Sequence, residues 1–300
     1  MTTNPLLRWN NDADDPAPLV ELKTRIVLYA ADPPGPDTAR TVYDIYMARF
    51  GSSITSYRST ALGSEPEDWT PPARLRFETT ELPDLRQREN WGYMFGSDQP
   101  SDARLFLFHG SRPVSEAGRA SLFRFDFEWD FDPDSLKQFA LEVLGSVECT
   151  CGTAGYVLVP DEGDYAAPAY DLMFAWARRY WGADAQDLDA IVEYALSGIP
   201  SVGWLTVIGP YLLKKDSDAP ARARAVAFAS CNAGSHLVIQ AEGRPRLIDR
   251  NRREPLGNYP AVADALASIQ ALAPIPFGGD MWDEDNTKRY LQRFSHPERM

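Results

Sequence analysis

Hydrophobic and polar residues alternate most regularly in the segment SLFRFDFEWDF, residues 121–131. Because successive side chains of a β-strand point to opposite faces, this alternation predicts a strand with an aromatic face in the core and an acidic face opposite. The two faces carry five rings and three carboxylates, namely Phe123, Phe125, Phe127, Trp129 and Phe131 on one side and Asp126, Glu128 and Asp130 on the other.

Apolar residues recur with a period of about 3.6 in three further segments, which predicts amphipathic helices there. These segments are residues 37–50, 132–145 and 163–182. The second begins at Asp132 or Asp134, either of which is suited to cap the first turn of a helix.

The rest of the chain predicts shorter elements and one long connection. Residues 60–100, rich in proline, glutamate and serine, predict an irregular or partly helical connection. The segments 102–110 and 121–131 predict a hairpin, and strand-helix units alternate with such hairpins. The sequence therefore predicts an α+β fold with a mixed, largely antiparallel sheet and packed helices. Further strands are expected at 24–32, 155–161 and 202–209 and as a pair within 236–249, and further helices at 187–198 and 259–272.

The charge balance restricts the kind of partner. The 300 residues include 30 basic and 43 acidic ones, a net charge of -13 at pH 7. This argues against direct binding to nucleic acid or to an anionic membrane surface, because both normally need a basic patch, and it fits a cationic protein partner. The first 20 residues lack the apolar run of a signal peptide, and the three cysteines are as sparse as in reducing compartments. We therefore expect a cytoplasmic protein.

Sequence signatures of catalysis and of metal binding are missing. The chain has no G-x-S-x-G, no P-loop, no G-x-G-x-x-G after a strand and no H-E-x-x-H. The three histidines, His109, His236 and His296, stand at positions more typical of structural roles, and Cys149 and Cys151 have the wrong spacing for a zinc knuckle. We predict no metal and no cofactor.

Two groups of carboxylates remain as candidates for function. Along a strand, same-face neighbours such as Asp126, Glu128 and Asp130 lie about 7 Å apart. That spacing is too long for three ligands of one Mg²⁺ at about 2 Å, but it suits a strip of negative potential. Such carboxylates could meet a basic partner, serve acid/base chemistry or merely face water. The second group is an acidic turn in MWDEDNTKRY that consists of Asp283, Glu284 and Asp285.

Three segments of the carboxyl half carry a resemblance: CGTAGYVLVPDEGD, AWARRYWGADAQDLD and SGIPSVGWLTVIGPYLL, in this order. In them the sequence resembles the bacterial type VI secretion immunity family, which includes immunity proteins for VRR-Nuc nuclease effectors. The resemblance covers about residues 20–280, with a poor match at 60–100. Gly182 is suited to end a helix in a left-handed conformation, and Trp204 to fill a core. The matching positions are Gly155, Arg179, Tyr180, Gly182, Gly198, Trp204, Leu205, Thr206 and Gly209.

The resemblance implies a protein that neutralises a cognate type VI or related effector, a nuclease, by tight 1:1 binding over its active site. It also implies one immunity-type domain at 21–280, between a flexible segment at 1–20 and a polar tail at 281–300. An acidic protein in the cationic groove of a nuclease blocks substrate without doing chemistry itself.

Under this interpretation the chain is not an enzyme, and its partner is the effector rather than nucleic acid or a membrane. The partner-binding residues would be Asp126, Glu128, Asp130, Asp283, Glu284 and Asp285. Two other hypotheses stay open, a carboxylate-dependent enzyme and a structural module of a secretion apparatus.

Overall fold

The structure is a computed structural model, and it describes residues 19–59, 66–87, 90–97, 105–111, 119–160, 166–271 and 275–299. Almost all of the segment 1–20, for which we predict flexibility, lies outside these ranges. Among the described helices, none combines the length and the apolar character that crossing a bilayer requires.

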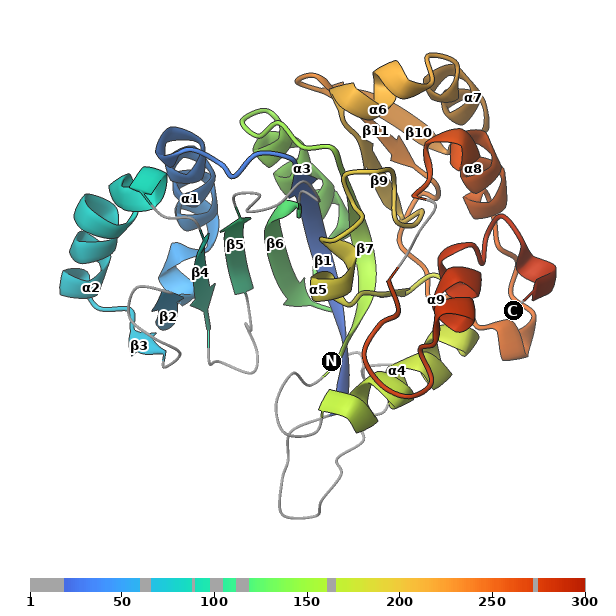
Figure 1. Ribbon diagram of the computed structural model, residues 1–300, viewed down its shortest axis with the longest axis horizontal. Coiled ribbons are helices and arrows are strands. Elements are labelled where there is room, and N and C mark those ends of the chain that lie inside the picture. The colour runs from blue at the N-terminus through green and yellow to red at the C-terminus, as the bar shows by residue number, and fades with distance from the viewer. Residues whose placement is uncertain are drawn as a thin grey trace.

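Eleven strands of the described chain form one sheet. They are β1 (Val20–Ala30), β2 (Ser56–Ser59), β3 (Glu67–Asp68), β4 (Asn90–Gly96), β5 (Leu105–Ser111), β6 (Ser121–Glu128), β7 (Cys151–Pro160), β8 (Asp184–Ala185), β9 (Leu205–Ile208), β10 (Ala229–Ala233) and β11 (His236–Gln240). Their order is β10-β11-β9-β7-β1-β6-β5-β4-β2-β3 (Figure 1). The short strand β8 pairs with β7. Only the β7–β8 pair among the described strands is parallel, so the predicted largely antiparallel α+β fold is confirmed.

Helices cover the two faces of the sheet as separate layers. They are α1 (Pro36–Phe50), α2 (Pro71–Arg76), α3 (Pro133–Leu144), α4 (Ala166–Arg179), α5 (Leu188–Ile191), α6 (Pro210–Lys215), α7 (Ala219–Val226), α8 (Tyr259–Leu266) and α9 (Glu284–Leu291). Buried residues of α1, α2 and α3 belong to one hydrophobic cluster, and those of α4 to α9 belong to another. In Figure 1, α1 and α2 lie at the left end of the sheet, and α7 and α8 lie at the right end.

The central strand β1 separates the two clusters. Its Ile26 and Leu28 belong to the cluster under α1 and α3, whereas Val27 and Tyr29 belong to the cluster under α4. All four side chains are buried, because β1 has a strand on each edge and helices on each face. A strand segment in such a position is a continuous apolar run, as residues 26–30 of β1 are.

The aromatic face of β6 lies in the core, as predicted. Phe123, Phe125 and Phe127 are fully buried. The ring of Phe125 stacks on Phe106 of β5 with the centroids 4.7 Å apart, and it meets Phe139 of α3 edge-on at 5.0 Å. Aromatic pairs in these geometries are worth about 0.5–1.5 kcal/mol beyond the area that they bury.

Trp129 does not belong to this row of rings, contrary to the prediction. The strand ends at Glu128 and a turn follows, so the period of two is lost before residue 129. Trp129 is half-buried and packs against the opposite hydrophobic cluster. The chain then brings Phe131 back to the first face, where its ring stacks on Phe127 at 4.5 Å.

The three long predicted helices are present with slightly different ends. The segment 37–50 forms α1 and 163–182 forms the shorter α4. The segment 132–145 forms α3, in which the carboxylate of Asp132 accepts a hydrogen bond from the Ser135 amide at 2.8 Å. This bond satisfies one of the backbone donors that a helix start leaves open.

Two predicted regions differ from the structure. The connection at 60–100 is partly helical in its described residues, but it also contains the core strand β4 with Trp91, Tyr93 and Phe95 buried. The strand pair expected within 236–249 is β10 with β11, so the partner of β11 precedes it in the sequence.

Residues 281–300 do not form a polar tail outside the folded body. Trp282, Tyr290 and Phe294 are each at most 2% exposed, and they belong to the cluster under α4. The Trp282 ring meets Phe174 of α4 edge-on at 5.0 Å. The outer face of α9 consists of exposed polar residues, namely Glu284, Asp285, Lys288 and Arg289.

Candidate functional site

Asp126 lies in the interior, so its predicted place on a solvent-facing acidic strip is wrong. It is 3% exposed and accepts from Arg25 at two points, with Nε to Oδ1 at 2.7 Å and Nη2 to Oδ2 at 3.0 Å. Arg124 of the same strand adds a contact of 2.7 Å to Oδ2. Burial alone would raise the pKa of Asp126, but the charges of Arg124 and Arg25 outweigh it and hold the pKa well below its usual range.

The other two carboxylates of the predicted strip lie at or beyond the end of β6. Glu128 is half-buried with 27% of its side chain exposed, and it lies 3.9 Å from Lys23 of β1. Asp130 is exposed in the turn that follows. Only the end of this strand therefore offers carboxylates to a partner.

The acidic turn at 283–285 begins helix α9. The Asp283 side chain caps it by accepting from the Asn286 amide at 2.6 Å. Glu284 and Asp285 are exposed in the first turn, where the helix dipole favours negative charge. All three side chains are exposed, so the turn presents acidic groups, and Asp283 also stabilises the helix.

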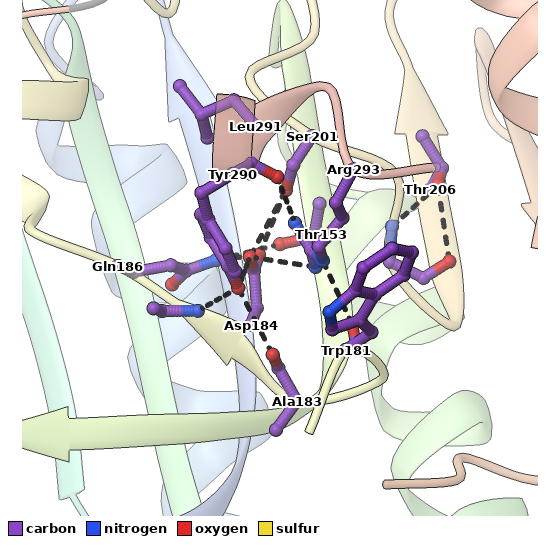
Figure 2. Close-up of polar contacts among 12 residues, drawn as sticks. Thr153, Trp181, Ala183, Asp184, Gln186, Ser201, Thr206, Tyr290, Leu291 and Arg293 are labelled. Carbon is purple, nitrogen blue, oxygen red and sulfur yellow. Dashed lines mark hydrogen bonds and ion pairs between the residues drawn. The ribbon is translucent and has the colours of Figure 1, made fainter. Parts of the chain in front are cut away.

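A buried polar network surrounds Asp184 on β8 (Figure 2). Its carboxylate accepts from Gln186 at 2.8 Å and from Ser201 at 3.0 Å. The hydroxyl of Tyr290 donates to it at 3.3 Å, and Arg293 lies 3.5 Å away. Through Gln186, which also accepts from Arg25 at 3.5 Å, the network continues to the Arg25–Asp126 ion pair.

This network connects parts of the fold in the interior and does not form a binding pocket. The space enclosed next to Asp184, Gln186 and Arg293 measures about 10 Å³, which is room for about one water molecule and not for a substrate. In the described residues, no group of three or more His, Cys, Asp or Glu side chains gathers as metal ligands would. The network ties β1, β8 and the C-terminal residues together.

An open cleft of about 670 Å³ lies over β4, β5 and β6, on the same face of the sheet as Asp126. Its floor is the sheet face opposite the aromatic rings, with Met94, Leu107 and His109, and α5 forms a wall with Leu188 and Asp189. Arg58, Arg119 and Arg124 also line it. An apolar floor with a few polar and charged groups is the usual lining of a pocket for a small molecule.

Both positively and negatively charged side chains line this cleft. Burial lowers the pKa of His109, and the Arg119 charge lowers it further against the opposing effect of Asp189. Arg119 pairs with Glu193 at 2.6 Å. Sequence reasoning missed the cleft, although Met94 and Leu107 alternate with the buried rings of Tyr93 and Phe106 and so mark a second apolar face.

The comparisons with known proteins agree with the sequence resemblance. Residues 46–294 match the family described as type VI immunity for VRR-NUC, and the chain belongs to this family. The structure is similar to that of a Pseudomonas aeruginosa T6SS protein, PA0821, with a TM-score of 0.74 and 18% sequence identity. That match covers 93% of this chain and 84% of the other, and at this identity it bears on the fold alone. The comparison with curated proteins gives no significant match.

Proposed function

We propose that this protein neutralises a VRR-Nuc effector by binding it tightly and covering its active site. The observation that carries the proposal is membership of the type VI immunity family over residues 46–294. Inhibition by occlusion needs a complementary surface and no turnover by the inhibitor, so the protein acts in stoichiometric amounts.

Charge complementarity supports this mode of inhibition. A nuclease holds a polyanionic substrate and needs a cationic groove for it. The net charge of -13 makes this chain a competitor for such a groove, and negative surface charge accelerates the encounter. Of the six carboxylates singled out in the sequence, Asp126 is buried and acts within the fold. The proposed contact residues are Glu128, Asp130, Asp283, Glu284 and Asp285.

The test is a cleavage assay with the purified VRR-Nuc effector and a DNA substrate. Increasing amounts of this protein should abolish cleavage at one molecule per effector molecule, and excess DNA should slow inhibition when it is added first. Full inhibition at far fewer molecules than effector would instead indicate an enzyme that modifies the effector. Failure to form a complex or to inhibit would refute the proposed function.

A further inference from the structure

Two arginines at the end of α4 and three in the turn at residues 250–253 lie on segments that are side by side. The backbones of Tyr180 and Asp249 form an isolated antiparallel bridge there, and the amide of Gly182 donates to the carbonyl of Leu247 at 2.8 Å. These bonds place two segments about 70 residues apart in sequence side by side. We call this group the arginine cluster, and it consists of Arg178, Arg179, Arg250, Arg252 and Arg253.

Carboxylates offset only part of this positive charge. Asp249 accepts from Arg179 at 2.7 Å and lies 3.7 Å from Arg252. The Arg179 guanidinium holds the pKa of Asp249 below its usual range. The carboxylate of Glu254 accepts from the Asp249 amide at 3.0 Å. The segments 178–182 and 249–254 contain five arginines and these two carboxylates, an excess of positive charge on a protein whose net charge is -13.

The turn holds a backbone conformation that ordinary residues rarely adopt. Ile248 has φ 57° and Arg253 has φ 56°, both in the left-handed region. For a β-branched residue such as Ile248, which is fully buried, this is a rare and costly state. A Cβ on Gly182 would lie 1.9 Å from the Arg246 carbonyl oxygen, so the two segments are in close contact. Strain that the surrounding structure maintains is typical of binding and switch sites.

Aromatic rings position the guanidinium groups before any partner arrives. Arg250 lies over the Trp181 ring at 4.6 Å and Arg179 over the Tyr180 ring at 4.8 Å. Arg252 is open to solvent, with 77% of its side chain exposed. Side chains that are already ordered lose less entropy on binding, which increases the affinity of a charged contact.

We propose that the arginine cluster binds a carboxylate-rich segment of the effector, an inference that rests on the proposed function. The planar fork of arginine pairs with a carboxylate through two parallel hydrogen bonds, and arginine is enriched among residues that dominate interface energy. Nucleic acid is the less suitable occupant, because the net charge of -13 repels a long polyanion. A positive cluster on an acidic surface also fixes the orientation of the partner, since a rotated complex would bring like charges together.

The test compares two double variants in binding to the purified effector. Arg252→Gln with Arg253→Gln removes two exposed charges from the cluster. The control, Arg40→Gln with Arg74→Gln, removes two exposed charges from α1 and α2 at the other end of the sheet (Figure 1). We expect the cluster variant to raise Kd about tenfold or more, mainly through faster dissociation. The control should bind like the parent, and both variants should keep the parent melting temperature.

The outcomes separate this inference from the proposed function. If the parent inhibits the effector and the cluster variant binds as tightly as the parent, the inference is wrong and the proposed function stands. If the parent neither binds nor inhibits, both are wrong. A parent that binds a DNA duplex through these arginines, with effector affinity unchanged in the variant, would assign the cluster to nucleic acid and also overturn the inference.

Discussion

Arg25 of β1 and Asp126 of β6 are register partners across the centre of the sheet, and their side chains form a two-point ion pair in the interior. The pair lies on the face opposite the phenylalanine rings of β6. Its position explains why a carboxylate in an alternating strand is not a surface group here. The face that the pattern predicts to be solvent-exposed carries the hydrophobic cluster under α4, and Gln186 contacts the ion pair there.

Replacing Asp126 with asparagine should destabilise the fold strongly. The substitution leaves Arg25 and Arg124 buried without their counter-charge, and breaking one side of a buried ion pair costs about 3–5 kcal/mol. Urea unfolding followed by circular dichroism measures the change. Asp264→Asn, an exposed change of the same charge on α8, is the control and should lie within about 0.5 kcal/mol of the parent. If Asp126→Asn unfolds at the same urea concentration as the parent, the buried carboxylate does not stabilise the fold.

The same ion pair predicts a pH dependence. The folded state holds the pKa of Asp126 well below its unfolded value, so the folded state keeps the charged form while the unfolded chain binds a proton. The stabilising contribution is therefore complete above the unfolded pKa of about 3.9 and decreases as pH falls below it. The difference in unfolding free energy between the parent and Asp126→Asn should be constant from pH 5 to 7 and should shrink from pH 4 to 3. If this difference grows as the pH falls, the folded state does not lower the pKa of Asp126.

Phe127→Ala should cost about 3–5 kcal/mol, because it removes a fully buried ring and leaves a cavity. The ring stacks on Phe131 and contacts Phe50 and Phe139, so several neighbours lose contacts together. Thermal and chemical unfolding measure the loss. Trp129→Ala, at the half-buried position on the other face, should cost less; equal costs would contradict the assignment of the two faces.

Deleting residues 281–300 should prevent the chain from folding. The deletion removes the buried side chains of Trp282, Tyr290 and Phe294 and takes Arg293 away from Asp184. We expect the truncated chain to be insoluble or to lack a cooperative unfolding transition. Deleting only residues 298–300 is the control, because it keeps Trp282, Tyr290, Arg293 and Phe294. If the truncated chain has the melting temperature of the parent, residues 281–300 are a tail that the fold does not need.

Neutralising the acidic end of β6 should slow association with the effector. Glu128→Gln with Asp130→Asn removes two charges that add little to stability, so the melting temperature should stay almost unchanged. The association rate at low salt should fall several-fold, and its dependence on salt should weaken. Glu148→Gln with Asp264→Asn gives the same change of net charge elsewhere on the surface. If both pairs lower the rate equally, total charge rather than this surface steers the encounter.

Local patterns in the sequence predicted most of the long elements but missed β4 and β10, and they did not predict what surrounds each element. The alternation around Phe125 predicts a core strand, but the pairing of Asp126 with Arg25 depends on strand register between residues 101 positions apart. Trp204 fills the core as predicted. Gly182 does not adopt a left-handed conformation; a close approach to the chain near Arg246 accounts for the glycine. Such long-range contacts have no signature in the spacing of residues.

The place of β1 in the sheet has a consequence for the order of folding. β1 is the first strand of the described chain to leave the ribosome, yet both of its neighbours, β6 and β7, come about 100 or more residues later. Until they emerge, the apolar residues 26–30 of β1 have no strand to pair with, and closing so long a loop is slow. The nascent chain therefore depends on protection from aggregation for longer than a protein whose central strand is made late.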